Sequence, residues 1–164
     1  MSDDEATIER LFQAARRFRE WCRELPPGDG ESMRELHRGA VLLARLYAEA
    51  LQVRRPAEFD PDIDARHQRK EEWDRALRAA GRLPFDEYAL IFDPHDLSET
   101  PCVGSLADDI ADIDRNLGEA LDLLERGHRA EAQWQIVFDF QSHWGRHAAS
   151  ALHAIHVKLA EEFL

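Results

Sequence analysis

The sequence predicts an all-α protein, folded as a single-domain antiparallel helical bundle of four long helices with one or two extra helices. Two observations predict this class. Apolar residues recur at steps of three and four along most of the 164-residue chain, and glycine or proline ends most of these periodic stretches. No stretch gives a convincing strand pattern. The length suits one domain, residues 1–164.

Three helices are predicted in the first half of the chain. The first spans residues 4–25 and is followed by a stretch rich in proline and glycine. The second spans residues 31–53, where six apolar residues form one stripe. A weaker third helix is expected over residues 62–80, although its first half is nearly all polar, and Gly81 ends it.

The next segment combines a short helix with a long loop. Pro84 suits a first helical position, so a short helix is expected from Pro84 through Phe92. Residues 92–104 then contain two prolines and a terminal glycine, and we expect them to form the longest loop outside the helices. Irregular segments often carry binding residues, which makes this loop a candidate interaction surface.

Two further helices complete the expected bundle. Ser105 and Asp108 have the spacing of a capping box, which places a helix start after Ser105 and its end near Gly127. The last helix is expected over residues 129–162. On a wheel at 100° per residue its polar sector contains Asp139. Its core-facing sector contains Trp134, Val137, Phe138, Gln141, Trp144, Ala148, Leu152, Ile155 and Leu159.

Charge is distributed unevenly along the chain. The formal net charge is −12, and residues 83–164 contain 16 acidic but only 5 basic side chains. Between Arg82 and Arg115 there are nine carboxylates and no lysine or arginine. This field repels phosphate backbones, so we expect no nucleic-acid partner. It favours divalent cations or a basic protein partner, and it also keeps a protein soluble.

Compartment and membrane association follow from the same composition. The N-terminal MSDDEATIER has neither the basic nor the apolar region of a signal peptide, and the longest apolar runs are five residues. Cys22 and Cys102 lack a metal-ligand spacing. We therefore expect a cytoplasmic protein with reduced thiols and no membrane association, and the oligomeric state stays open.

Two polar clusters stand out on the last two predicted helices. His143 and His147 lie one turn apart, His143 at the border of the apolar arc and His147 inside it, a spacing that can hold one metal ion. Asp109, Asp112 and Asn116 lie on one flank of the preceding helix and offer hard oxygen ligands. Antiparallel packing can bring the two clusters together, which makes Asp109, Asp112, His143 and His147 candidate ligands of a divalent metal.

A structural interpretation stands beside the metal hypothesis. Carboxylates in a first turn favour the helix dipole, which is enough to explain Asp108 and Asp109. A buried Asp–His network around Asp112 can fix the register of the bundle without any metal. A tryptophan at helical spacing, such as Trp144, is more often part of the core than a platform for a ligand.

Two segments carry a resemblance to a known family. They are FDPHDLSETPCVGSLADDIADIDRNL (92–117) and WQIVFDFQSHWGRHAASALHAIH (134–156). They resemble an uncharacterised bacterial domain-of-unknown-function family, numbered 5063, which has an "FDP" loop, a "GSL-x-DDLADIY-x-DL" helix start and an "HWG-x-H" segment. The residues that match are Phe92, Asp93, Pro94, Gly104, Ser105, Leu106, Asp108, Asp109, Ala111, Asp112, Ile113, His143, Trp144, Gly145 and His147.

The resemblance implies an all-helical fold and no known activity. It directs attention to the same two polar clusters, and it adds Asp93, Asp108 and Trp144 as secondary candidates. Two positions depart from the pattern, because Asp114 stands where tyrosine is expected and Asn116 where aspartate is expected. Asn116 weakens any carboxylate-rich metal site.

Two functional hypotheses follow from the sequence. The first is a protein-interaction module, an adaptor or an inhibitor of a basic partner, because the chain lacks a catalytic signature and is acidic. The alternative is a divalent-metal-dependent hydrolase of a small phosphorylated or nucleotide-like substrate, using the Asp/His cluster between the last two helices. In that case one histidine would serve as general base.

Overall fold

The structure, a computed structural model that describes residues 3–25, 32–67 and 70–161, is 69% helical. The expected class, an all-α single-domain helical bundle, is confirmed. The elements, in order along the chain, are α1 (Asp3–Glu24), α2 (Ser32–Ala50), α3 (Lys70–Ala80), β1 (Glu87–Leu90), β2 (Cys102–Ser105), α4 (Leu106–Glu125), α5 (Arg129–Asp139), the π-helical turn η1 (Phe140–Trp144) and α6 (Gly145–Ala160).

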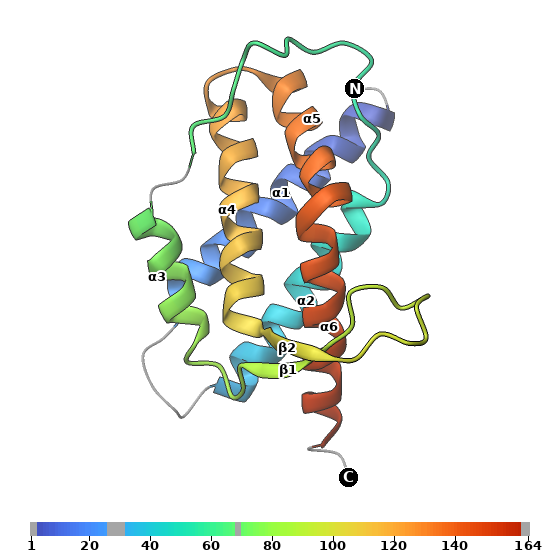
Figure 1. Ribbon diagram of the computed structural model, residues 1–164. Coiled ribbons are helices and arrows are strands. Elements are labelled where there is room, and N and C mark those ends of the chain that lie inside the picture. Colours follow the sequence, from blue (N-terminus) through green and yellow to red (C-terminus); the bar gives the residue numbers. More distant parts are fainter. Residues whose placement is uncertain (1–2, 26–31, 68–69, 162–164) are drawn as a thin grey trace.

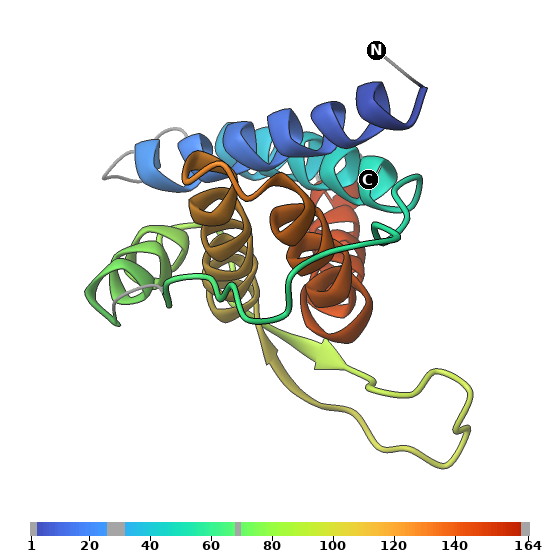
Figure 2. The ribbon, with the colours of Figure 1, turned by 90° about the horizontal axis from the view of Figure 1, so that it is seen from above.

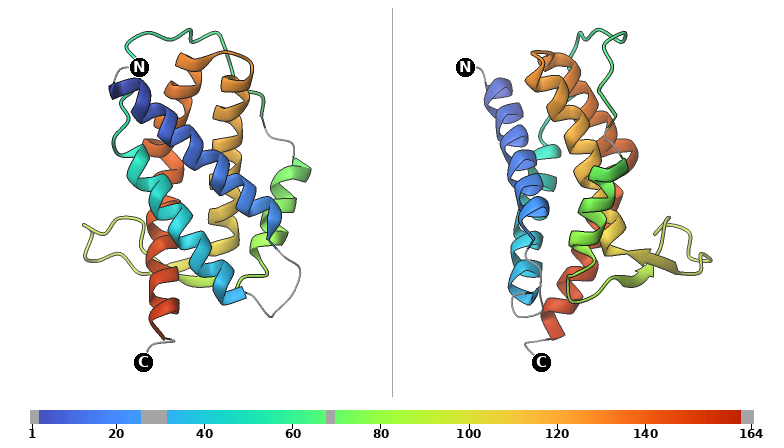
Figure 3. Two further views of the ribbon diagram at one scale, coloured as in Figure 1. Left: turned by 180° about the vertical axis from the view of Figure 1, so that it is seen from behind. Right: turned by 90° about the vertical axis from the view of Figure 1, so that its left-hand side faces the viewer.

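The helices form two layers. Helices α1 and α2 pack side by side in one layer, and α4 with the continuous α5–η1–α6 helix forms the other (Figure 3). Helix α1 crosses α4 obliquely, and α2 packs on α6 (Figure 1). Helix α3 lies at the edge of the second layer against α4. The two layers bury the aromatic side chains Phe12, Phe18, Trp21 and Trp144 between them.

The start of α4 agrees with the capping pattern in the sequence. The Ser105 hydroxyl accepts a hydrogen bond from the Asp108 backbone N–H at 3.1 Å. Asp86 Oδ1 accepts from the Ala107 backbone N–H at 2.8 Å and from the Ser105 hydroxyl at 2.9 Å. These bonds satisfy amides of the first turn, which have no partner inside the helix. The first turn of α4 is therefore well anchored.

The short helix expected from Pro84 through Phe92 is wrong, because residues 87–90 form a strand. Strand β1 pairs with β2 in antiparallel register, with Tyr88 opposite Gly104. A Cβ atom at position 104 would lie 2.7 Å from the Tyr88 ring, so glycine is required for the ring to lie there. This long-range packing outweighs the local helix signal of proline. The hairpin and its loop project from the body of the molecule (Figure 2).

The third helix is shorter than predicted. It begins at Lys70 rather than residue 62, and residues 68–69 lie outside the described residues. The stretch before it forms a strap across the ends of α4 and α5, where Phe59 stacks on Trp134 with ring centroids 4.8 Å apart. The Asp60 backbone N–H also donates to Glu131 at 2.9 Å. Ile63 and Ala65 of this stretch pack against the core, but its few apolar residues give no continuous helix face, so it forms no helix before Lys70.

The long last helix contains a π turn that the sequence analysis did not predict. The Gly145 N–H donates to the Phe140 carbonyl, an i→i+5 bond that inserts one extra residue into the turn. A Cβ atom at Gly145 would lie only 2.3 Å from that carbonyl oxygen. Residue 162, the expected end of this helix, lies outside the described residues.

The π turn rotates the buried face of this helix. Before the turn the buried residues are Ala132, Ile136, Val137 and Asp139, and after it they include Ala148, Ala151 and Ile155. On a regular wheel these two sets are offset by about 107°, close to the 100° that one residue contributes. A wheel drawn without the π turn therefore gives wrong predictions at three positions. Asp139, predicted on the polar face, is buried, whereas Gln141 and Phe138, predicted to face the core, are exposed.

Two expectations about membranes and thiols can be compared with the structure. None of the helices in residues 3–25, 32–67 and 70–161 has both the length and the hydropathy needed to cross a membrane. Cys22 is buried and Cys102 is exposed, and both are free thiols. Burial raises the pKa of the Cys22 thiol well above its usual value, which disfavours its thiolate form.

Candidate metal centre

Helix α4 and the η1–α6 segment bring the two polar clusters of the sequence together. The contacts pair Asp109 with His147, Asn116 with His143, and Asp112 with both histidines. As residue numbers increase along α4, the numbers of their partners decrease along the last helix, as they do between antiparallel helices. The structure therefore joins the five residues of the predicted polar cluster at one interface.

Each histidine has one ring nitrogen held by an acceptor on α4. His147 Nδ1 lies 2.6 Å from Asp109 Oδ1, and His143 Nδ1 lies 2.7 Å from Asn116 Oδ1. Because both partners are acceptor oxygens, each Nδ1 carries the proton. The Nε2 lone pairs are then available to bind a ligand.

The two Nε2 atoms point toward the same carboxylate oxygen. His143 Nε2 lies 3.7 Å from Asp112 Oδ2, and His147 Nε2 lies 3.9 Å from it. The imidazole rings lie 4.7 Å apart at an angle of 63°. Histidines that bind metals donate their other N–H to a carboxylate or carbonyl, as these two do. The arrangement is therefore one in which two imidazoles and Asp112 could share a metal ion.

Asp112 is oriented by hydrogen bonds to its other oxygen. The Trp73 indole N–H donates to Asp112 Oδ1 at 2.9 Å, and Arg115 Nη2 lies 3.0 Å from the same oxygen. Oδ2, the oxygen nearest to both histidines, is left for a cation. All three prospective ligands thus have a second group that fixes their orientation, a feature of metal sites.

The spacing of the three ligand atoms suits a small divalent ion. One ligand atom from each of Asp112, His143 and His147 lies within 4.8 Å of the other two. A tetrahedral ion with bonds of ~2.1 Å holds its ligand atoms ~3.4 Å apart. Small side-chain rotations would bring these three atoms to that separation. Two histidines and one carboxylate leave at least one coordination position open.

The site is reachable from solvent but shielded by protein. The side chain of His143 is 33% exposed, and those of His147 and Asp112 are 18% and 13% exposed. The hydrogen bond that His147 donates to Asp109 raises the pKa of His147, whereas burial, followed by the charge of His147, lowers the pKa of His143. His147 is therefore protonated more readily than His143. A cation bound between the two imidazoles would compete with the proton on His147.

Asp109 lies behind His147, not among the three converging ligands. Its Oδ1 contacts His147 and its Oδ2 accepts a hydrogen bond from the Tyr88 hydroxyl. Burial, together with this bond, raises the pKa of Tyr88, so the hydroxyl remains a donor. Strand β1 is in this way connected to the site through Asp109.

The secondary candidates are dispersed. Asp108 lies beside the cluster, where burial and then the charge of Asp112 raise the pKa of its carboxyl. Trp144 is fully buried, and its indole N–H donates to the Ile136 carbonyl at 3.3 Å, so it belongs to the core. Asp93 lies in the hairpin loop, where its side chain accepts from the His95 backbone N–H.

Trp73, Arg115 and Tyr88 belong to this site without being predicted from the sequence. Trp73 lies within the predicted third helix, and Tyr88 lies within the short helix that proved wrong. Arg115 lies three residues after Asp112, a helical spacing that does indicate contact between the two. The other two contacts depend on tertiary packing that no local pattern reveals.

Comparisons with known proteins give a family and a fold. The family described as "Domain of unknown function (DUF5063)" matches residues 3–161. No curated protein matches the sequence. Among solved structures, the chain is similar to the crystal structure of protein BF1032 from Bacteroides fragilis, with a TM-score of 0.73 and 13% identity over 92% of this chain and 90% of that one. At this identity the likeness concerns the fold alone.

Proposed function

Since the chain belongs to the DUF5063 family, a domain of unknown function, we propose a function from its geometry: it binds one divalent transition-metal ion through Asp112, His143 and His147. The observation that carries this proposal is the shared orientation of the two imidazoles. In each ring, Nδ1 is hydrogen-bonded to an acceptor oxygen on α4, and Nε2 is directed at Asp112 Oδ2. A network that served only packing has no need to converge both Nε2 atoms on one oxygen.

The activity that we propose for this centre is metal-dependent hydrolysis of a small oxyanion-bearing substrate, such as a phosphate ester. A divalent ion with an open position can polarise a phosphoryl oxygen and lower the pKa of a bound water. Both histidines act as ligands here, so neither is the general base that the sequence hypothesis invoked.

The charge around the site supports an anionic substrate despite the acidic chain. Only five basic residues occur in residues 83–164, and two of them, Arg115 and Arg146, flank the candidate centre. Arg115 contacts Asp112, while Arg146 lies beside His147 with its guanidinium 5.1 Å above the Phe92 ring. Their two positive charges offset part of the repulsion that an oxyanion would otherwise meet.

Metal content and melting temperature test the binding. Protein purified without a histidine tag is stripped with chelator and titrated with Zn²⁺, Mn²⁺, Co²⁺ or Ni²⁺. At 100-fold excess over the dissociation constant a specific ion adds ~2.7 kcal/mol, which raises the midpoint by roughly 6–11 °C. Asp112→Asn and His147→Ala should abolish the rise, while His153→Ala, an exposed histidine on the same helix, should retain it.

Hydrolysis is tested separately on the metal-loaded protein. Turnover of p-nitrophenyl phosphate should require the ion and disappear in Asp112→Asn. If the ion binds but no phosphate ester is turned over, the hydrolase proposal fails and the metal site stands. If no ion shifts the midpoint, both fail, and the five residues form a register-fixing network.

We also propose a second function, because a different feature favours it: the hairpin loop is an interaction surface for a basic protein partner. Leu97 is 98% exposed and Val103 is 74% exposed. Carboxylates order the loop, since Glu99 accepts from the backbone N–H groups of Phe92 and Asp93. An acidic hairpin that presents apolar side chains suits a partner with a basic rim around an apolar pocket.

The partner proposal has its own test. Tagged protein is used to capture partners from the native lysate at low salt, in parallel with Leu97→Asp and with Asp112→Asn. A partner that Asp112→Asn retains, but that Leu97→Asp and 0.5 M salt both remove, supports this surface. Capture that is unaffected by Leu97→Asp contradicts it.

A further inference from the structure

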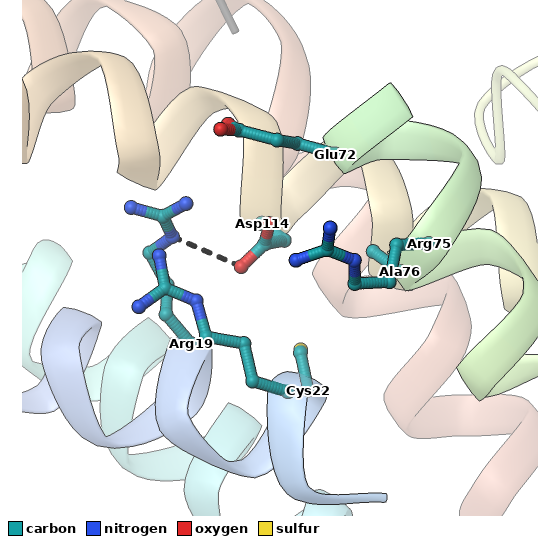
Figure 4. Close-up of a pocket in the computed structure, with 7 residues that line it drawn as sticks. Arg19, Cys22, Glu72, Arg75, Ala76 and Asp114 are labelled. Carbon is teal, nitrogen blue, oxygen red and sulfur yellow. Dashed lines mark hydrogen bonds and ion pairs between the residues drawn. The ribbon is translucent and has the colours of Figure 1, made fainter. Parts of the chain in front are cut away.

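A cavity on the opposite side of α4 from the candidate metal centre is lined by three arginines. Its volume is about 230 Å³, and it lies between α1, α3 and α4. Figure 4 shows the side chains of these helices directed into it. The residues that line it are Arg19, Cys22, Arg23, Glu72, Arg75, Ala76 and Asp114. Three guanidinium groups therefore face two carboxylates, in a chain whose net charge is −12.

Arg19 is fixed in place on the wall of this cavity. Its Nε donates to Asp114 Oδ1 at 2.9 Å, and the two side chains are only 12% and 5% exposed. A Cβ atom at Gly118 would lie 2.8 to 2.9 Å from Cζ and both terminal nitrogens of Arg19. These near-equal distances mean that the guanidinium lies face-on against the backbone of α4 at a glycine. Arg19 is therefore preorganised, with its terminal nitrogens held in position.

The other two arginines leave the cavity with one positive charge in excess, because three guanidinium groups face only Glu72 and Asp114. Across residues 3–25, 32–67 and 70–161, the side chains of Arg23 and Arg75 make no hydrogen bond or ion pair. In Figure 4 the Arg75 guanidinium points across the cavity toward Asp114. Asp114 is already engaged by Arg19, so it does not offset Arg23 and Arg75 as well. The excess positive charge favours an anionic ligand in the cavity.

We propose that this cavity is a binding site for the oxyanion of a small molecule, a phosphate or a carboxylate, held between Arg23 and Arg75 with Arg19 behind them. Planar guanidinium groups bind such groups through paired, charge-assisted hydrogen bonds. The cavity adjoins a larger depression of about 560 Å³ that shares Arg19, Arg23 and Glu72 with it. That depression gives room for the rest of a ligand.

The site is independent of the proposed metal centre. Asp112 and Asp114 lie two residues apart on α4, about 200° around the helix, so they face different neighbours. The cavity is bounded by α1 and α3, whereas the histidines belong to η1 and α6. Failure of one proposal therefore leaves the other standing.

Calorimetric titration of the chelator-treated full chain tests the proposal. Inorganic phosphate and malonate are titrated separately in a chloride buffer of low ionic strength. One-to-one binding is expected, with affinity at least tenfold lower in Arg23→Gln and in Arg75→Gln. Arg78→Gln provides the matched control, because Arg78 is exposed on the same helix, one turn farther along, and does not line the cavity.

The two probes separate the possible sources of the oxyanion. Binding of phosphate alone assigns a phosphorylated ligand, and binding of malonate alone assigns a carboxylate. Binding of both supports the oxyanion class, and Asp112→Asn should bind like wild type in every case. The proposal is overturned if neither anion binds, or if Arg78→Gln lowers affinity as much as Arg75→Gln does. Arg23 and Arg75 are exposed, so their replacement should leave the melting temperature unchanged.

Discussion

His147 Nε2 and Asp112 Oδ2 face each other across the α4–α6 interface, 3.9 Å apart, while the opposite side of each group is held by another residue. Asp109 holds the imidazole through Nδ1, and Trp73 holds the carboxylate through Oδ1. Both members of the pair are thus oriented by a hydrogen bond to a third residue. Replacing the residues that make such hydrogen bonds should therefore change metal affinity, which can be measured.

Asn116 controls the basicity of His143 and should therefore tune metal affinity. Asn116→Leu removes the acceptor of the Nδ1–H and should weaken metal binding by about 10–100-fold. Asn116→Asp should strengthen it, because a carboxylate makes the imidazole a better donor to the ion. Competition with a fluorescent chelator measures both. If Asn116→Leu bound the metal as tightly as the wild type, a ligand role for His143 would be contradicted.

Trp73 should matter through its N–H group more than through its bulk. Trp73→Phe keeps an aromatic ring but leaves Asp112 Oδ1 without its indole donor, so metal affinity should fall about tenfold. Trp134→Phe is the matched control, since Trp134 stacks on Phe59 far from the ligands along the helix. The same chelator competition applies, and equal affinities in the two variants would remove Trp73 from the site.

Asp139 is a buried carboxylate that should destabilise the protein as pH rises. Burial raises its pKa from 3.8 to about 6, so between pH 4 and 6 the folded state binds more protons than the unfolded state. The free energy of unfolding therefore falls as pH rises through this window. A rise of about 2 pKa units corresponds to about 3 kcal/mol as an upper bound.

Asp139→Asn should remove that penalty. At pH 7 the variant should be more stable by up to about 3 kcal/mol, and the gain should vanish below pH 4, where the native carboxyl is neutral. The hydrogen bond from Gln135 is retained, because an amide oxygen also accepts. Urea unfolding from pH 4 to 7 measures the difference between the two proteins. A constant difference across this range would contradict the assignment of the penalty to ionisation.

Gly145 should be required by the π turn. Gly145→Ala places a methyl group 2.3 Å from the Phe140 carbonyl oxygen, so backbone must shift, at a cost of about 1–3 kcal/mol. Ser142→Ala lies in the same turn with an exposed side chain and should change stability by less than about 0.5 kcal/mol. Urea unfolding compares the two. Equal stability of both variants would show that the turn tolerates a side chain at position 145.

The helical bundle could be predicted because its helices carry their own evidence. Residues 4–25 and the start after Ser105 have apolar periodicity or caps within the segment itself, and the observed helices agree within one or two residues. The strand at residues 87–90 carries no such local signal. Its existence depends on Gly104, seventeen residues away from Glu87, making room for the Tyr88 ring.

The candidate site was predicted in part for a similar reason. Spacing alone placed His143 with His147 and Asp109 with Asp112 and Asn116, because one helix face holds each set. Which atom each group directs to the centre depends on the crossing of two helices and on the π turn. Asp109 therefore proved to lie behind His147, while Asp112 occupies the central place.

The π turn has a consequence for how this sequence can change by insertion and deletion. The turn accommodates one residue more than a regular helix does, so the loss of one residue between Phe140 and Trp144 would restore a regular helix and leave every later side chain on its present face. If the turn became regular with all its residues kept, the later side chains would instead rotate by about 100°. The face that packs on α2 would then rotate away, and His147 would leave Asp112. This turn is therefore the one place described in this helix where a residue can be lost without a change in the packing on either side.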